Sequence, residues 1–306
     1  MSGTWELPDW LTRMPDKRRL FAEDTYFVEA WQDALETVPD VAGYCARHTY
    51  LLVKPEALGT GRLPRIVRWL ADMGWQVTAT RQLTASRHVL RGLWRYHWNA
   101  VTRQHKDVVD LLFGTGPCLF LLLRSATALG APATEVFSGQ KGPAKPERRS
   151  AGELRFELGQ YNAYLNFVHS PDEPADLLRE LAVLFPDEDR RALLATADAG
   201  QVPVVQPSYV DHPTWNTLDF HEAARRIGGV LGRRASLVDD AVAARDAGTW
   251  TGDWREIRAA LDALDPAMTR EPDFVVFASY LTSAEVAGRS RQIATVRGPA
   301  SSVPAS

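Results

Sequence analysis

One segment of the chain, from Pro117 to Leu123, is apolar at every position: Pro-Cys-Leu-Phe-Leu-Leu-Leu. It is the longest candidate for a membrane span, but a span needs roughly 18 apolar residues, so we expect no membrane segment. A short run without polar alternation is typical of a strand that is buried on both faces. The segment therefore predicts the central strand of a sheet that is covered from both sides.

Strand-like and helix-like segments alternate around this run. A second strand is predicted over 49–53, where a short apolar run stops at Lys54-Pro55. Further strands are predicted over 75–83 and 164–169, where apolar and polar residues alternate. Helical spacing of apolar residues predicts helices over 63–73, 86–97, 101–113 and 174–185. This order predicts an α+β fold, a ferredoxin-like βαββαβ sandwich over 48–185.

The two flanks of this unit predict additional, mostly helical segments. We expect a helical N-terminal extension over 1–47, with a helix from Ala22 to Val38. A mostly helical region is expected over 186–296, where 274–281 fits either a strand or a helix. Its other helices are predicted over 190–199, 218–231, 236–247 and 254–264. The Pro/Ser/Ala-rich residues 297–306 predict a disordered tail.

Charge is distributed unevenly along the 306 residues, although the net charge is only -3. Residues 49–185 carry 17 Lys and Arg against 12 Asp and Glu, whereas each flank is acidic by four charges. A basic middle region suggests an anionic ligand. Compositional drift in a GC-rich genome is the alternative, and the 30 Arg against 5 Lys fit it. We expect no nucleic-acid partner, because no Arg tract interleaved with aromatic residues occurs.

Composition also bears on the setting of the protein. The 45% hydrophobic residues exclude a disordered chain. The N-terminus lacks the basic and apolar regions of a secretory signal, and Cys45 and Cys118 are too few for a disulfide framework. We therefore expect a soluble protein in the reducing cytoplasm.

Three short motifs occur in a fixed order within the basic region. Lys54-Pro55 directly follows a predicted strand, Asn166-Phe-Val-His169 ends another, and Glu180 comes eleven residues after His169. This ordered set resembles the nucleoside diphosphate kinase family over about residues 48–185. The resemblance implies the same ferredoxin-like fold and a phosphorylated histidine at His169.

Each motif residue has a chemical interpretation and a structural one. A neutral imidazole such as His169 can attack a phosphoryl group, or it can be an ordinary packed histidine. Glu180 can hold the other imidazole N–H, as the resemblance implies, or be a helix-surface acid. By resemblance Lys54 contacts the transferred phosphate and Asn166 holds the nucleotide sugar. Asn166 could instead make a structural hydrogen bond to a neighbouring loop.

The sequence also departs from the family pattern. After His169 it continues Ser170-Pro171-Asp172, so that Pro171 replaces a family serine whose hydroxyl supports the His–Glu pair. Proline also removes a backbone donor. The family arginine and threonine that grip the nucleotide phosphates have no clean match, because Glu135 and Lys141 fall near their places.

Other residues are candidates for the missing contacts. Arg155 matches a second phosphate-binding arginine if one residue is inserted before Asn166. Replacement charge is available from the Gly/Pro-rich segment 139–155, which is otherwise a solvated mobile loop: Lys141, Lys145, Arg148 and Arg149. Candidates to clamp the nucleotide base are Tyr96, Trp98 and His105.

These observations predict a nucleotide-dependent phosphotransferase that uses ATP or another nucleoside triphosphate with Mg²⁺. The acceptor is a nucleoside diphosphate or a specialised small molecule. Two alternatives stay open: nucleotidyl transfer or activation with His169 only binding phosphate, and a non-catalytic nucleotide-binding module. Pro171 discriminates between them, because a phosphohistidine enzyme tolerates it only if Glu180 still reaches His169. We expect the extensions to pack over the cleft or replace oligomer contacts, leaving a monomer or small homo-oligomer.

Overall fold

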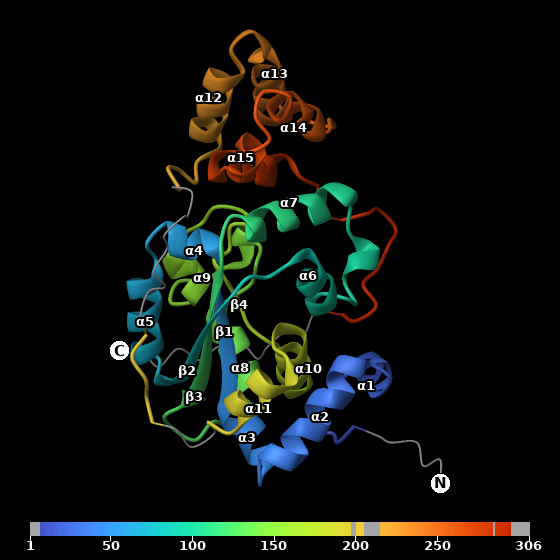
Figure 1. Cartoon of the computed structure of the whole chain (residues 1–306), viewed down its shortest axis with the longest axis vertical. Coiled ribbons are helices and arrows are strands. Elements are labelled where there is room, and N and C mark those ends of the chain that lie inside the picture. Colours follow the sequence, from blue (N-terminus) through green and yellow to red (C-terminus); the bar gives the residue numbers. More distant parts are fainter. Residues whose placement is uncertain (1–6, 197–199, 205–214, 284, 295–306) are drawn as a thin grey trace.

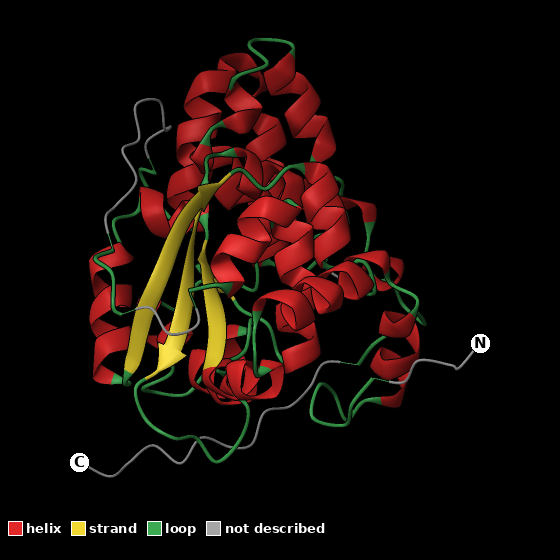
Figure 2. Ribbon diagram, turned by 60° about the horizontal axis from the view of Figure 1, so that its bottom comes forward, coloured by secondary structure: helices red, strands yellow, loops and turns green. Residues whose placement is uncertain are grey.

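A computed structural model describes residues 7–196, 200–204, 215–283 and 285–294, so the predicted tail 297–306 lies outside the described residues. At its centre is a four-stranded antiparallel sheet in the order β2-β3-β1-β4 (Figure 2). The strands are β1 (His48–Val53), β2 (Trp75–Leu83), β3 (Cys118–Ser125) and β4 (Val168–His169). This is the ferredoxin-like order, which confirms the predicted fold class.

The apolar run that predicted a central strand forms most of β3. The first six residues of β3 are buried, and β3 lies between β2 and β1. All six residues of β1 are buried as well, and Leu51 pairs with Leu121 across the two strands. The prediction of a central strand buried on both faces is thus confirmed.

The predicted fourth strand over 164–169 is wrong for most of its length, because only Val168 and His169 pair with β1. Before them the chain turns. Both Tyr164 N and Leu165 N donate to the side-chain oxygen of Asn162, and Phe167 has a φ of 68°. The alternation of apolar residues reflected a buried turn held by side chains rather than by a strand ladder.

Seven helices belong to the same unit as the sheet, and the predicted helix over 86–97 is shorter than expected. It ends at Leu93, and a 3₁₀ turn follows over Trp98–Ala100. The helices are α4 (Pro55–Gly59), α5 (Leu63–Asp72), α6 (Arg87–Leu93), α7 (Arg103–Gly114), α8 (Ala133–Lys141), α9 (Leu154–Leu158) and α10 (Pro174–Leu184). Ten of the eleven residues of α10 are buried, because other elements surround it.

The N-terminal extension forms three helices, α1 (Pro15–Ala22), α2 (Thr25–Thr37) and α3 (Val41–Arg47). In Figure 1, α1 and α2 lie beside α10 and α11 (Asp187–Leu194), on the side of the sheet that α10 covers. A buried ion pair joins α2 to α10, with Arg179 Nε 2.9 Å from the Asp24 carboxylate. The extension therefore covers α10, which packs on one face of the sheet.

Four helices of the C-terminal region gather at one end of the molecule (Figure 1). They are α12 (Phe220–Leu231), α13 (Ser236–Asp246), α14 (Arg255–Asp262) and α15 (Pro272–Leu281). The segment that fitted a strand or a helix is thus a helix, α15, and it contacts α7 of the sheet unit.

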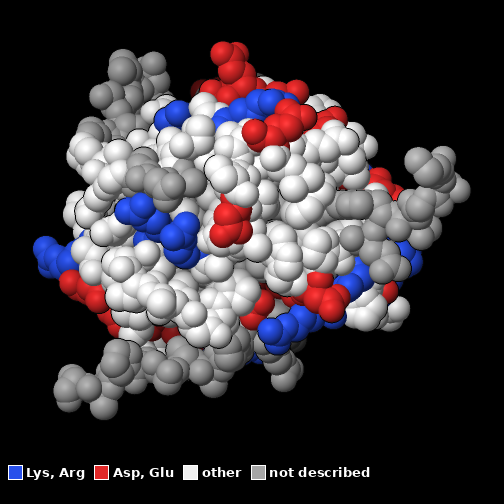
Figure 3. All heavy atoms as spheres, turned by 90° about the horizontal axis from the view of Figure 1, so that it is seen from below, with Lys and Arg blue, Asp and Glu red and all other residues white. Residues whose placement is uncertain are grey.

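None of the helices in the described ranges is long and apolar enough to cross a membrane. On the face shown in Figure 3, acidic and basic side chains form small mixed groups rather than one basic field. On this face the lysines and arginines of the protein do not gather into one patch. Several of those in residues 49–185 line a cavity instead.

Candidate functional site

A cavity of about 1200 Å³ lies between α6, α7, β4 and α10. Small-molecule sites typically measure about 300–1,000 Å³, so this one has room for a nucleotide. All seven residues that were predicted to form the site line it: Lys54, Tyr96, Lys141, Arg155, Asn166, His169 and Glu180. A second cavity of about 310 Å³ between α7 and residues 250–255 brings together no comparable pair of nucleophile and base.

The His169 side chain is held by the helix behind it. Its Nε2 lies 3.0 Å from Oε2 of Glu180, which α10 presents from eleven residues further along the chain. An ionised carboxylate can only accept, so Nε2 carries the proton in this pair and Nδ1 keeps its lone pair. Nδ1 makes no hydrogen bond within the described part of the chain. The ring also packs edge-on against Trp94, at 5.5 Å between centroids.

Sequence reasoning missed Tyr50, whose hydroxyl donates a short hydrogen bond to the same Oε2 of Glu180. Tyr50 lies in β1, is fully buried, and its ring centroid is 6.1 Å from that of His169. Burial and the neighbouring Glu180 raise the pKa of the phenol well above its ordinary value, so it stays protonated and donates. A signal existed, because a tyrosine within a buried strand needs an acceptor for its hydroxyl.

Lys54 is buried at the end of β1. Its Nζ lies 2.8 Å from Oε1 of Glu56 and donates to the backbone oxygen of Tyr164 at 2.8 Å. Burial lowers the pKa of Lys54, and the Glu56 carboxylate opposes that shift. The same Oε1 accepts from Phe167 N at 3.0 Å, which ties the lysine to the turn before His169. Glu56 is the second residue that sequence reasoning missed.

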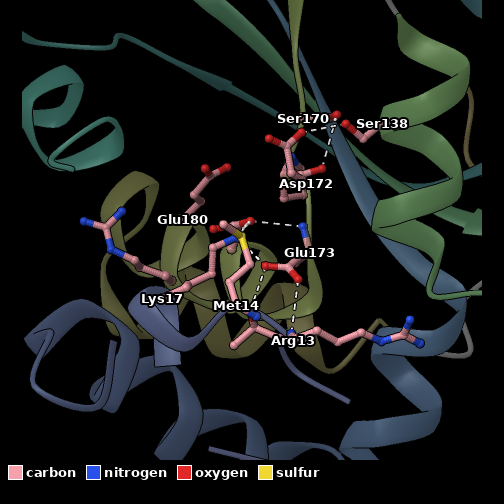
Figure 4. A network of polar contacts seen from close by, with 12 residues as sticks. Arg13, Met14, Lys17, Ser138, Ser170, Asp172, Glu173 and Glu180 are labelled. Carbon is pink, nitrogen blue, oxygen red and sulfur yellow. Dashed lines mark hydrogen bonds and ion pairs between the residues drawn. The ribbon is translucent and has the colours of Figure 1, made fainter. Parts of the chain in front are cut away.

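Lys141 and Asp172 lie on another wall of the cavity. Lys141 Nζ donates to Ser170 Oγ at 2.7 Å, and Ser138 Oγ donates to Asp172 Oδ1 at 2.6 Å (Figure 4). Burial lowers the pKa of Lys141 to about 8. Burial acts to raise the pKa of Asp172, but the Lys141 ammonium and the Ser138 hydrogen bond outweigh it and lower that pKa. Asp172 is therefore ionised at neutral pH.

The segment 139–155 is more ordered than a solvated loop. Arg155 is buried and donates to the backbone oxygens of Gly142 at 2.9 Å and Val168 at 2.5 Å, which lowers its freedom to move. Burial lowers the pKa of Arg155 to about 10. Lys141 and Arg149 are buried as well, whereas Lys145 and Arg148 are exposed.

The remaining predicted residues are partly occupied by internal bonds. Tyr96 lines the cavity, but its hydroxyl donates to Asp24 at 2.7 Å. Asn166 donates to the Ala163 oxygen at 2.6 Å, the structural hydrogen bond that was the alternative for this residue. Trp98 and His105 lie on the cavity wall, and Nδ1 of His105 is 3.0 Å from the Tyr164 hydroxyl. Glu135 does not line the cavity.

The site thus combines a ferredoxin-like sheet with a histidine–glutamate pair beside a cavity that several lysines and arginines line. The sequence model of the family "Nucleoside diphosphate kinase" matches residues 47–190. A nucleoside diphosphate kinase of Frankia alni is 30% identical over 145 residues, which are 46% of this chain and 96% of that protein. The chain belongs to the nucleoside diphosphate kinase family.

Two further comparisons are weaker. Thioredoxin domain-containing protein 6 of Xenopus laevis is 24% identical over 162 residues, which are 52% of this chain and only 25% of that protein. Among solved structures, an NDP kinase from Pyrobaculum aerophilum covers 46% of this chain and 97% of its own, at 19% identity and a TM-score of 0.40.

Proposed function

We propose that the chain transfers the γ-phosphoryl group of ATP, or another nucleoside triphosphate, through a phosphohistidine at His169. The observation that carries the proposal is the 3.0 Å contact between His169 Nε2 and Glu180, which leaves Nδ1 facing no internal partner among the described residues. Pro171 does not break this pair: Glu180 still reaches His169, as a phosphohistidine enzyme requires. The acceptor is a nucleoside diphosphate or a specialised small molecule in the cytoplasm.

The reaction proceeds in two balanced halves. The lone pair of Nδ1 attacks the γ-phosphorus, the bond to the bridging oxygen breaks, and the nucleoside diphosphate leaves with that electron pair. An oxygen of the acceptor then attacks the same phosphorus, and the phosphorus–nitrogen bond breaks. The proton on Nε2 stays on the ring in both halves, held by Glu180. Positioning and charge neutralisation do most of the work in such transfers.

Positive charge around the transferred group comes from buried cations that line the cavity. Lys54, Lys141 and Arg155 belong to three separate segments, and each is already held by internal bonds. Groups that are held in advance stabilise developing charge without reorganising during the reaction. Mg²⁺ would enter on the nucleotide phosphates, and Asp172 fits it because this ionised carboxylate lines the cavity and hard cations prefer such oxygens.

The test is phosphorylation with γ-labelled ATP. The intact protein should acquire an acid-labile, base-stable label that His169→Ala abolishes. His88→Ala is the matched control, because His88 is exposed on α6 and does not line the cavity. A label that survives in His169→Ala would overturn the nucleophile assignment. Nucleotide binding without any label would favour nucleotidyl transfer or a non-catalytic binding module.

A further inference from the structure

A C-terminal segment, residues 285–294, returns from the helical region to the cavity; we call it the strap. It follows α15 and runs along residues 96–102 of the sheet unit (Figure 1, red). Backbone hydrogen bonds attach it near both ends, from Val286 N to Ala100 O and from Gln292 N to Tyr96 O, each 3.0 Å. Asn99 adds a side-chain bond to Ser290 O at 2.8 Å. The strap is therefore docked on the catalytic unit.

The end of the strap reaches the site. Ile293 is 5% exposed and packs into the hydrophobic core, which anchors the segment beside the cavity. Arg291, two residues earlier, lines the cavity and is exposed. The backbone of Arg291 is attached on both sides, because Ser290 O accepts from Asn99 and Gln292 N donates to Tyr96 O. An attached backbone has less conformational freedom to lose on binding than a free chain end.

The cations that line the cavity include buried and exposed ones. Lys17, Lys54 and Arg179 are buried, and each lies beside a buried carboxylate. Within the described part of the chain, the exposed cations of the lining come from two segments, Lys145 and Arg148 before α9, and Arg291 from the strap. A polyphosphate carries charge along its whole length, so cations from separate segments can contact it at separate oxygens.

We propose that Arg291 binds the phosphate chain of the nucleotide, so that the strap completes the binding site of the catalytic unit. This inference rests on the proposed function for the choice of ligand. Arginine suits the role because its planar fork matches phosphate oxygens in a bidentate arrangement.

Two histidines on the same side of the cavity do not compete for this role. Burial, and next to it the positive charge of Arg291, lower the pKa of both His97 and His105 to about 4. Both imidazoles are therefore neutral at pH 7. Arg291 therefore supplies positive charge to this side of the cavity, whereas the two histidines do not.

The experiment is calorimetric titration of the full chain with ATP and with inorganic tripolyphosphate. Arg291→Gln should weaken both by about tenfold, as expected for a lost charge-assisted contact. Arg291→Lys should recover part of the affinity. Arg289→Gln is the matched control, because Arg289 lies in the same segment, is exposed and does not line the cavity. It should bind both ligands as the unaltered protein does.

The outcomes separate this inference from the proposed function. ATP affinity that is unchanged in Arg291→Gln, or equally reduced in Arg289→Gln, overturns the role of Arg291. If the protein binds ATP and tripolyphosphate through Arg291 but acquires no label at His169, the inference holds and the proposed function fails. If neither ligand binds the unaltered protein, both are wrong.

Discussion

The two extensions of this chain are attached in different ways to the unit that they share, the sheet with helices α4–α10. The N-terminal helices are fixed by three buried ion pairs, Lys17 with Glu173, Asp24 with Arg179 and Asp33 with Arg190. The helices α12–α15 pack mainly against one another, as in the stacked rings of Phe220 and Phe277 at 5.4 Å. Their links to the unit include the contact of α15 with α7, a hydrogen bond from Asn162 Nδ2 to Ser279 Oγ at 2.8 Å, and the strap.

This difference separates a structural role from a binding role. The N-terminal pairs lie in or beside α10 and α11, so they hold the helix that presents Glu180. Figure 4 shows Lys17 and Glu173 in one polar network, in which Lys17 also pairs with Asp176 of α10. The strap contributes surface hydrogen bonds and one cavity arginine. Loss of the N-terminal contacts should therefore cost stability, whereas loss of the strap contacts should cost ligand affinity.

The largest effect is expected from Asp24→Ala. It leaves Arg179, which is 2% exposed, without its carboxylate, and an unpaired buried charge costs about 3–5 kcal/mol. Urea unfolding should show a fall in the free energy of unfolding of that size. Arg65→Ala is the control, because its pair with Glu157 is exposed and such pairs contribute about 0–1 kcal/mol. Equally small changes of the free energy of unfolding in both variants would contradict a structural role for the N-terminal extension.

An intermediate effect is expected from Tyr50→Phe, which tests whether contacts from the sheet orient Glu180 as well. Losing a hydrogen bond to a carboxylate, worth about 1.5–3 kcal/mol, should slow phosphohistidine formation about ten- to a hundredfold.

Tyr44→Phe is the matched control for this variant. The Tyr44 hydroxyl is also buried, but it has no hydrogen-bond partner among the described residues. Its removal should leave the rate of phosphohistidine formation unchanged. A Tyr50→Phe protein that forms phosphohistidine at the unaltered rate would show that Tyr50 is only a packing residue.

The smallest effect is expected from Asn99→Ala, which removes one attachment of the strap. Asn99 is exposed, so the free energy of unfolding should change by less than about 1 kcal/mol. ATP affinity should fall by roughly threefold, because Arg291 is held less firmly and its ordering costs more on binding. A loss of stability as large as that of Asp24→Ala would contradict the proposed division between the two extensions.

Local sequence patterns were sufficient for the long elements of the sheet unit. The strands β1 and β3 were predicted from continuous apolar runs, β2 from alternation with a period of two, and the helix α10 from apolar residues with helical spacing. The turn before β4 was mistaken for a strand, because its backbone is bonded to Asn162 and Glu56 rather than to a ladder. Such bonds leave no period in the sequence.

Only the part of the candidate site that the three sequence motifs form could be predicted. His169, Glu180 and Lys54 were found because their motifs, in this order, resemble those of the family. Tyr50, which donates to Glu180, and Arg291, which lines the cavity, were missed because each lies over 100 residues from His169 along the chain. Contacts of this kind depend on the tertiary fold, which no window of the sequence contains.

The left-handed turn at Phe167 bears on any attempt to graft this site onto another protein. Phe167 O accepts from Lys54 N at 2.9 Å, and Phe167 N donates to the Glu56 side chain. The positive φ of Phe167 costs conformational energy, and these two hydrogen bonds from the end of β1 and the start of α4 hold it. A transplanted Asn-Phe-Val-His segment would relax without them. The smallest portable unit is therefore two segments, Lys-Pro-Glu together with Asn-Phe-Val-His, carried on neighbouring antiparallel strands.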